Sequence, residues 1–195
     1  MKNNKLRIYL TGVGGQGTLT ATTLLARTVM DCGLPVVSGE IHGMAQRGGV
    51  VESTILIGGW QSPTIFHGQA DVILGFDPLE TLRGLSYLAD DGYIFSSTDF
   101  LPPASVNTGK AIMPSLEDVK SSIAKVTQKT FYAPLQQIGL KAGNIQSGNT
   151  ALIAILCKQD ILPFGLDALR NSIKKYLPAK LHDANLAAIE IAIAN

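Results

Sequence analysis

The chain has 195 residues, 46% of them hydrophobic and 16% charged, with a formal net charge of +1. Such an apolar composition excludes an intrinsically disordered chain, and the length favours one domain over residues 1–195 rather than two domains with a cleft between them. The near-neutral charge, with scattered Lys and Arg residues, argues against nucleic acid or an anionic membrane as the main partner.

The first half of the chain alternates strand-like and helix-like segments. We expect strands at residues 6–11, 36–38, 50–57, 71–76, 92–97 and 129–133, and helices at residues 18–32 and 115–125. This order predicts an α/β fold, a Rossmann-like, doubly wound and mostly parallel sheet with helices on both faces. After Pro134 the pattern becomes helical, and residues 151–156 are apolar all round, which is typical of a helix buried on most sides.

A glycine-rich motif lies between the first expected strand and helix, with the sequence Gly12-Val13-Gly14-Gly15-Gln16-Gly17, followed by Thr18. A glycine turn lets the backbone approach a ligand closely, and the next helix directs its N–H groups and positive dipole end at an anion. The glycine spacing also fits the dinucleotide fingerprint, and plain close packing is the alternative. We predict that the phosphate-binding or cofactor-binding residues are Gly12, Gly14, Gly15, Gln16, Gly17 and Thr18.

A Walker A loop is disfavoured, because Thr18 stands where the phosphate-binding Lys would follow the last glycine. A nicotinamide-dinucleotide site stays open as an alternative, because Glu40 lies close to the position of the acid that holds the ribose. That alternative makes the chain a free-standing NAD(P)-binding or nucleotide-binding domain. Against it, nothing downstream looks like a second, substrate-binding domain.

The second distinctive motif is the polar loop expected at residues 40–49. Loops at the carboxyl ends of strands in a doubly wound sheet share one edge, so this loop should lie beside the glycine motif. The guanidinium of Arg47 in this loop could hold a phosphate or carboxylate with two hydrogen bonds. The alternative is a solvated surface loop in which the Arg and Glu side chains pair with each other. We take as candidate active-site or interface residues Glu40, His42, Met44, Gln46 and Arg47.

The sequence assigns no catalytic residue and no metal ligand. It has no Gly-x-Ser-x-Gly elbow and no His-Glu-x-x-His pair. Asp77 lies at the carboxyl end of an expected strand, but a helix-capping role before Pro78 explains it adequately. The only two cysteines, Cys32 and Cys157, are far apart, so they cannot supply an iron–sulfur ligand set, and we expect both to be buried, reduced thiols.

The two motifs together resemble the gamma-type subunit or domain of the 2-oxoacid:ferredoxin oxidoreductases, with the indolepyruvate-type enzymes the most similar. The resemblance extends over nearly the whole chain. It includes residues 71–80 and 148–152 and the closing helix with Asn185. It implies a single gamma-type domain of the pyruvate/ketoisovalerate oxidoreductase kind.

The resemblance implies a subunit of a complex that oxidatively decarboxylates a 2-oxoacid, makes an acyl-CoA and passes electrons to ferredoxin. It places thiamine diphosphate, Mg²⁺ and the iron–sulfur clusters on larger partner subunits, with CoA as co-substrate. The glycine motif would then be a surface that faces phosphate, and the loop at residues 40–49 would meet the partner's active-site region. A homodimer of this chain is a further partner that the sequence leaves open.

The apolar runs are shorter than the roughly 20 residues that a transmembrane helix needs, so we expect no membrane association. The N-terminal residues lead directly into a strand without a signal-peptide pattern, which favours a cytoplasmic protein.

Overall fold

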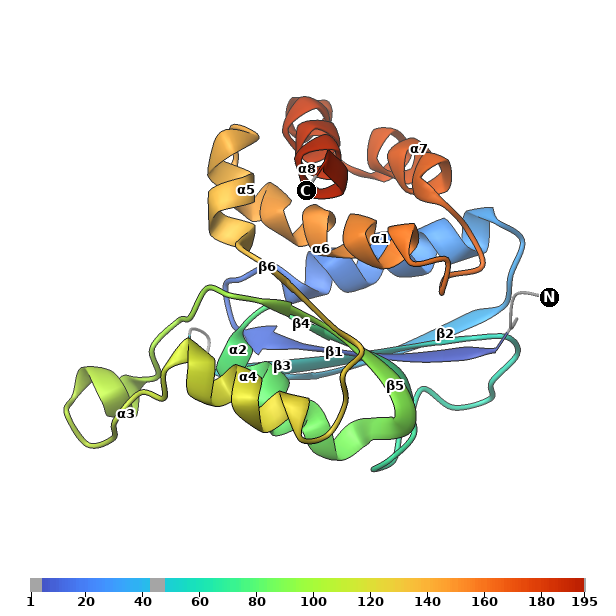
Figure 1. Cartoon of the computed structure of the whole chain (residues 1–195). Helices are drawn as coiled ribbons and strands as arrows, with labels where there is room; N and C mark the ends of the chain where they lie inside the picture. The colour runs from blue at the N-terminus through green and yellow to red at the C-terminus, as the bar shows by residue number, and fades with distance from the viewer. Residues whose placement is uncertain (1–4, 43–47, 195) are drawn as a thin grey trace.

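The computed structural model describes residues 5–42 and 48–194 and contains a six-stranded mixed sheet between two groups of helices (Figure 1). The strands are β1 (Leu6–Val13), β2 (Val36–His42), β3 (Val50–Ile57), β4 (Ala70–Gly75), β5 (Leu88–Ser97) and β6 (Thr130–Ala133). The α-helices are α1 (Thr18–Asp31), α2 (Pro78–Arg83), α3 (Ala104–Asn107), α4 (Leu116–Ala124), α5 (Leu135–Lys141), α6 (Gly148–Lys158), α7 (Leu166–Tyr176) and α8 (His182–Ala194).

The sheet has the strand order β2-β3-β1-β4-β5-β6. Strands β1, β4, β5 and β6 are mutually parallel, whereas β3 runs antiparallel to both of its neighbours, β1 and β2. The expected α/β fold with a mostly parallel sheet is therefore confirmed. The reversed β3 is a departure from a fully parallel doubly wound sheet, and it places β2 at the outer edge, one strand away from β1.

One face of the sheet carries most of the helical mass. Helices α1 and α6 lie on this face, and α5, α7 and α8 pack on them from outside (Figure 1). Helix α6 is buried on almost every side, as its all-round apolar sequence predicts. The sheet contributes Ile8, Leu10, Val72 and Leu74 to this core. Such a two-deep helical layer explains why so few residues of this chain are charged.

The opposite face of the sheet is covered more thinly. Helices α2 and α4 pack there over a smaller core that includes Tyr9, Ile73, Val119 and Ile123. Helices thus cover both faces, as expected. The cover does not extend over the whole sheet, because neither helix packs on β2 or β3. A cavity lies on that part of the face.

Two strands continue further at their carboxyl ends than the sequence predicts. Strand β1 continues past Thr11 to Val13, because residues 12 and 13 still pair with β3. Strand β2 continues to His42, since its outer residues pair with β3 as well. Between β5 and α4 the chain also forms the short helix α3. In both strands the added residues are held by backbone pairing, which a side-chain pattern does not report.

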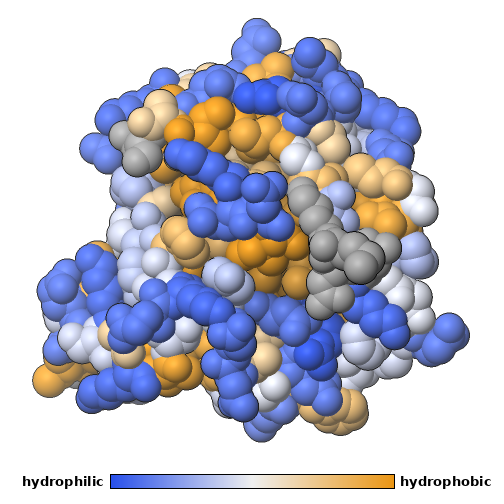
Figure 2. Space-filling model, turned by 45° about the vertical axis from the view of Figure 1, so that its right-hand side comes forward, coloured by the Kyte–Doolittle hydropathy of each residue, from blue (hydrophilic) through white to orange (hydrophobic). Residues whose placement is uncertain are grey.

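The structure also bears on the expected burial of the two cysteines and on the question of a membrane-spanning helix. Figure 2 shows apolar residues gathered among polar ones on one face of the molecule. Cys157 is buried as predicted, whereas the prediction for Cys32 is wrong, because its position just after α1 leaves it exposed. Within the described residues, no helix combines the length and hydropathy needed to cross a bilayer.

Candidate anion-binding site

The glycine turn, residues 12–18, connects the end of β1 to the start of α1. Gly15 and Gly17 both have positive φ angles, 101° and 85°, which glycine adopts without the steric penalty of a Cβ. Gly12 is needed for a different reason, because a Cβ there would come within 2.6 Å of Thr18 Oγ1. The three positions therefore require glycine through conformation or close approach.

Two backbone donors of the turn have no acceptor among the described residues. Gly14 N donates to Gly49 O at 2.8 Å, and Gln16 N donates to Val13 O at 3.0 Å. Among the described residues, the N–H groups of Gly15 and Gly17 donate no hydrogen bond. No acidic residue occupies the first turn of α1, and no side chain caps it. The positive end of the helix dipole is thus left uncompensated, as an anion site requires.

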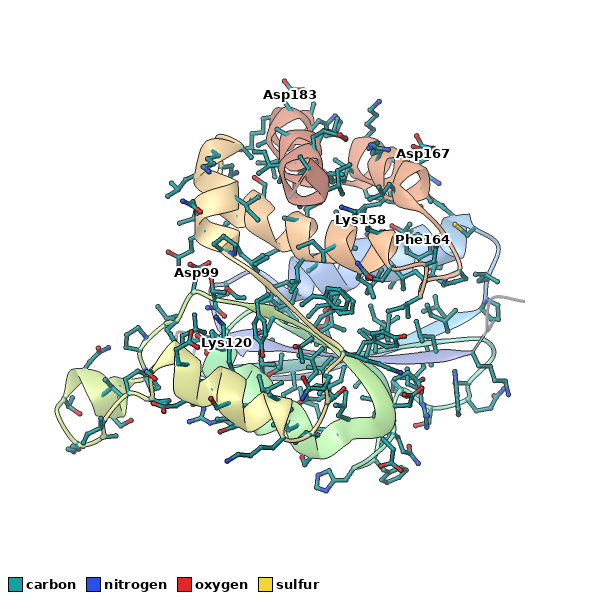
Figure 3. All side chains as sticks on the ribbon, in the orientation of Figure 1. Asp99, Lys120, Lys158, Phe164, Asp167 and Asp183 are labelled. Atoms are coloured by element: carbon teal, nitrogen blue, oxygen red, sulfur yellow. The ribbon has the colours of Figure 1, made fainter. Side chains whose placement is uncertain are left out.

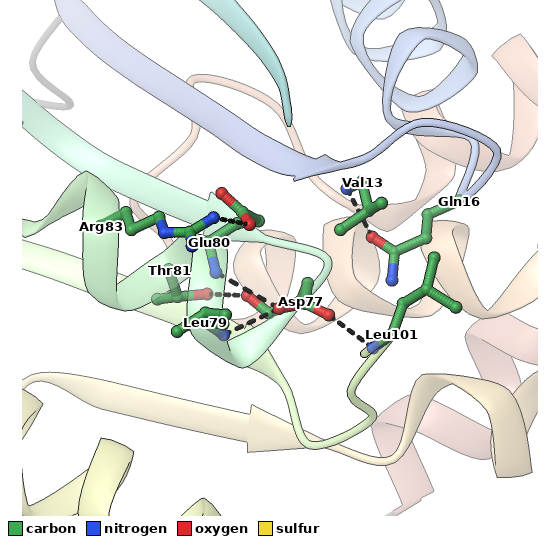
Figure 4. A network of polar contacts seen from close by, with 8 residues as sticks. All are labelled: Val13, Gln16, Asp77, Leu79, Glu80, Thr81, Arg83 and Leu101. Atoms are coloured by element: carbon green, nitrogen blue, oxygen red, sulfur yellow. Dashed lines mark hydrogen bonds and ion pairs between the residues drawn. The ribbon is translucent and has the colours of Figure 1, made fainter. Parts of the chain in front are cut away.

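Thr18 and Gln16 do not share one role. The Gln16 side chain folds back, and its Oε1 accepts from Val13 N at 2.8 Å, so it stabilises the turn itself (Figure 4). Thr18 is 2% exposed, and its Oγ1 has no hydrogen-bond partner within the described structure. A buried unpaired hydroxyl costs about 1–3 kcal/mol. Thr18 is therefore the side chain of the turn with unused hydrogen-bonding capacity.

Asn149, at the start of α6, holds the turn from the opposite side, and its Nδ2 donates to Gln16 O. A Cβ on Gly17 would approach the same amide nitrogen to 2.6 Å. The residue was noted in the sequence only as part of the family resemblance. A contact across 133 positions has no local sequence signal, so residue patterns did not reveal it.

A pocket of about 180 Å³ opens beside the turn. Its polar walls are the carboxylate of Asp99 and the amides of Gln136, Gln146 and Asn149, and Phe76 contributes apolar surface. Asp99 lies at the end of the sheet close to α5 (Figure 3), where it accepts from Gln136 N at 2.8 Å. None of the described residues that line this pocket is Lys or Arg. Attraction for an anion at the described part of the site comes from backbone N–H groups rather than side-chain cations.

The structure divides the second motif. Glu40 lies within β2, paired with Ser53, and His42 ends that strand, so the expected loop begins later than predicted. The side chain of His42 and the whole of Met44, Gln46 and Arg47 lie outside the described residues. At the other end of the motif, the hydrogen bond from Gly14 N to Gly49 O brings the loop against the glycine turn.

Glu40 is not placed where a dinucleotide site would need it. In the dinucleotide fold the acid that holds the ribose follows the strand next to β1. Here β3 occupies that position and runs in the opposite direction, so Glu40 on β2 lies one strand further out. This topology disfavours the nicotinamide alternative.

Asp77 caps helix α2, as predicted, and it also has a second role (Figure 4). Its Oδ1 accepts from Leu79 N at 2.8 Å and Glu80 N at 3.3 Å. Its Oδ2 accepts from Leu101 N at 2.8 Å, which attaches the segment after β5 to the end of β4. Asp77 makes these three hydrogen bonds while it is only 1% exposed. Asp77 is therefore a structural residue at the edge that carries the turn.

The described residues include no group of three or more His, Cys, Asp or Glu side chains that could hold a metal ion. The two cysteines differ in exposure, and neither forms a disulfide. An iron–sulfur cluster is typically held by four ligands, so these residues do not fit one.

Comparisons with known proteins agree with the fold. Residues 7–195 match the family described as pyruvate ferredoxin/flavodoxin oxidoreductase. The chain is 36% identical to indolepyruvate oxidoreductase subunit IorB of Archaeoglobus fulgidus, over 96% of this chain and 93% of that protein.

Two solved structures have a similar fold. Pyruvate oxidoreductase subunit PORC from Thermotoga maritima has a TM-score of 0.69 at 21% identity, covering 99% of this chain and 97% of that one. The 2-oxoglutarate:ferredoxin oxidoreductase of Magnetococcus marinus has a TM-score of 0.67 at 14% identity, covering 98% of this chain and 31% of that longer one. The family resemblance seen in the sequence is thus confirmed, and the chain belongs to the pyruvate ferredoxin/flavodoxin oxidoreductase family.

Proposed function

We propose that this chain is a subunit of an indolepyruvate-type 2-oxoacid:ferredoxin oxidoreductase, in which the glycine turn faces the phosphates of CoA. The observation that carries the proposal is the turn itself, with unpaired N–H groups at the uncompensated start of α1. The indolepyruvate assignment draws on the 36% identity to IorB. The Magnetococcus marinus structure contains CoA, which makes CoA the first phosphate ligand to test.

The proposal assigns the redox chemistry to a larger partner subunit. That subunit would hold thiamine diphosphate, Mg²⁺ and the iron–sulfur clusters, which together supply decarboxylation and electron transfer to ferredoxin. This chain would contribute the phosphate-facing turn and, through residues 40–49, a surface toward the partner's active site. The ligand set supports this division, because two separate cysteines do not fit a cluster. The whole chain would act as one gamma-type domain.

The first experiment tests dependence on the partner. The purified chain and its co-purified complex are assayed for ferredoxin reduction with indolepyruvate, pyruvate or 2-oxoglutarate, each with CoA. We expect turnover only in the complex and highest kcat/KM with indolepyruvate. Turnover by the isolated chain, or tight NAD(H) binding without a CoA response in calorimetry, would overturn the assignment in favour of a free-standing nucleotide-binding domain.

A second experiment tests the turn within the complex. Gly15 and Gly33 both have positive φ, 101° and 73°, and a Cβ at either would meet no atom within 4 Å. The two Gly→Ala variants therefore carry comparable backbone strain at opposite ends of α1. We expect Gly15→Ala to raise the KM for CoA several-fold and Gly33→Ala to leave it unchanged. An equal KM in both variants would remove the turn from CoA binding.

A further inference from the structure

A second cavity, which we call the acidic pocket, lies on the sheet face opposite α1. It has a volume of about 270 Å³ and lies over β1, β2 and β3, beside the 3₁₀ turn that precedes β5. Its lining residues include Tyr9, Tyr87, Glu52 and Thr54, whereas Glu40 borders it from β2, paired with Ser53. Nothing in the proposed CoA site uses these side chains.

The Tyr9 hydroxyl is the unusual feature of this pocket. Tyr9 is 2% exposed, and its hydroxyl has no partner at hydrogen-bond distance and angle within the described structure, although the Glu52 and Thr11 side chains lie close to it. Leaving such a group buried and unpaired costs about 1–3 kcal/mol. Burial, followed by the neighbouring Glu52 carboxylate, raises the pKa of Tyr9, so the group stays a neutral O–H. Glu52 and Tyr87, which both lie near the Tyr9 hydroxyl, line the cavity. The unused hydrogen-bonding capacity of the Tyr9 hydroxyl is therefore on the side of the cavity.

The surroundings of the pocket carry negative charge. The carboxylate of Glu52 lines it, and none of its described lining residues is Lys or Arg. Glu80, which lies near Glu52, is 3% exposed, and its Oε2 has no hydrogen-bond partner within the described structure. Arg83 Nη1 donates a hydrogen bond to the other carboxylate oxygen of Glu80, Oε1, at 2.6 Å. A buried anion would be repelled here, and a cation would be attracted.

The aromatic and hydroxyl groups narrow the choice of cation. Tyr9 and Tyr87 stack with ring centroids 4.4 Å apart, and an organic cation is attracted to the face of such rings. Thr54 Oγ1 already donates to Pro63 O at 2.6 Å, so its remaining capacity is that of an acceptor. The ligand must therefore donate hydrogen bonds. The described residues include no set of ligands for a metal ion.

We propose that the acidic pocket binds a small organic ammonium ion, with its N–H groups toward Glu52 and the Tyr9 hydroxyl. The apolar stem of the ligand lies against Tyr87 and Ile65. The volume is below the roughly 300–1,000 Å³ of sites for drug-sized ligands, which limits the stem to one ring or a short alkyl chain. Because the site lies on the other sheet face, its occupation is independent of the proposed CoA function.

The test uses the full chain and three probes of similar shape. Phenethylamine carries the ammonium group, 2-phenylethanol is its neutral counterpart, and 3-phenylpropionate is an anion. In calorimetry at pH 7 we expect phenethylamine to bind, 2-phenylethanol to bind at least about tenfold more weakly, and 3-phenylpropionate to give no heat of binding. Binding of all three with similar affinity, or of none at millimolar concentration, would overturn the proposal.

Four variants locate the site. Tyr9→Phe removes only the hydroxyl and keeps the ring that stacks on Tyr87, and Glu52→Gln removes only the charge. Each should weaken phenethylamine binding about tenfold or more. Tyr176→Phe and Glu117→Gln make the same chemical changes outside the pocket and should leave binding unchanged. Unaltered affinity in folded Tyr9→Phe and Glu52→Gln proteins, checked by circular dichroism, would contradict the proposal without affecting the CoA result for Gly15.

Discussion

The glycine turn and the acidic pocket both depend on strand β1, but they differ in the sign of their electrostatic potential. On the α1 side, unpaired N–H groups at a helix start attract an anion, and no acid lies in the first helical turn. On the opposite side, the carboxylate of Glu52 lines the pocket and makes its surroundings negative. Successive residues of a strand face opposite sides of the sheet, so one strand serves both sites without mixing them.

The difference shows two ways of making a polar site. The glycine turn relies on backbone groups, which keep their polarity at every pH and require close approach rather than particular side chains. The acidic pocket relies on side chains, which are titratable and sensitive to single substitutions. The four predictions below test this contrast. They begin with Asp77 at the end of β4, where the largest change in stability is expected.

Asp77 lies at the carboxyl end of β4, and its carboxylate holds both helix α2 and the segment after β5. Asp77→Ala loses the α2 cap, worth about 1 kcal/mol, and leaves Leu101 N without its acceptor, which costs about 1–3 kcal/mol more. We expect the free energy of unfolding to fall by about 2–4 kcal/mol in urea denaturation. Ser115→Ala, which removes a capping box in an exposed position, should cost only about 1 kcal/mol. Equal losses would show that the Leu101 contact contributes nothing.

Two glycines of the turn separate backbone strain from steric contact. Gly15→Ala adds a Cβ into open space and should cost about 1–2 kcal/mol from strain alone. Gly17→Ala should cost about 1 kcal/mol more, because the new Cβ displaces the Asn149 amide from Gln16 O. Thermal and urea unfolding of both variants measure the difference. If Gly15→Ala proves the more destabilising, the Asn149 contact does not hold the turn.

Tyr9→Phe should change the free energy of unfolding in the opposite direction. It removes a buried hydroxyl that has no partner, so we expect the free energy of unfolding to rise by about 1 kcal/mol. Tyr176 offers the matched comparison, because its hydroxyl donates to Asp31 Oδ1 at 2.7 Å. Tyr176→Phe should therefore lower stability by about 0.5–1.5 kcal/mol. Destabilisation by Tyr9→Phe would mean that its hydroxyl is satisfied in solution.

The smallest effect is expected in the pH dependence that Glu80 contributes. Burial, with smaller contributions from Asp77 and Glu52, raises the pKa of Glu80 above its ordinary value of 4.5 despite the Arg83 ion pair. The folded state then holds the Glu80 proton more tightly than the unfolded state. This group consequently lowers stability as the pH rises from about 4.5 through the raised pKa.

Urea unfolding of the wild type and Glu80→Gln at intervals between pH 4 and pH 7 measures this contribution. The stability of Glu80→Gln relative to the wild type should rise across the interval. Glu117→Gln, on the exposed surface of α4, should show no such trend. A relative stability of Glu80→Gln that falls with pH would mean that Arg83 outweighs burial.

Prediction from the sequence worked best where the deciding contacts are local. The cap at Asp77 bonds to N–H groups within three residues, so residue type and spacing were sufficient to predict it. The glycine positions were also predictable, because the strand before them and the helix after them are both marked by their own patterns. The end of β2 was not, since its extension to His42 depends on pairing with β3.

By itself, the sequence determined the α/β class, the family, the position of the glycine turn and the lack of a cluster-binding cysteine set. Only the tertiary structure decided that β3 runs backwards between β1 and β2, that Asn149 reaches Gln16, and that Tyr9 shares a cavity with Glu52. The physical reason is the range of the interactions. Helix caps and glycine turns are satisfied within a few residues, whereas strand order and the partners of buried polar groups depend on which distant segments the core brings together.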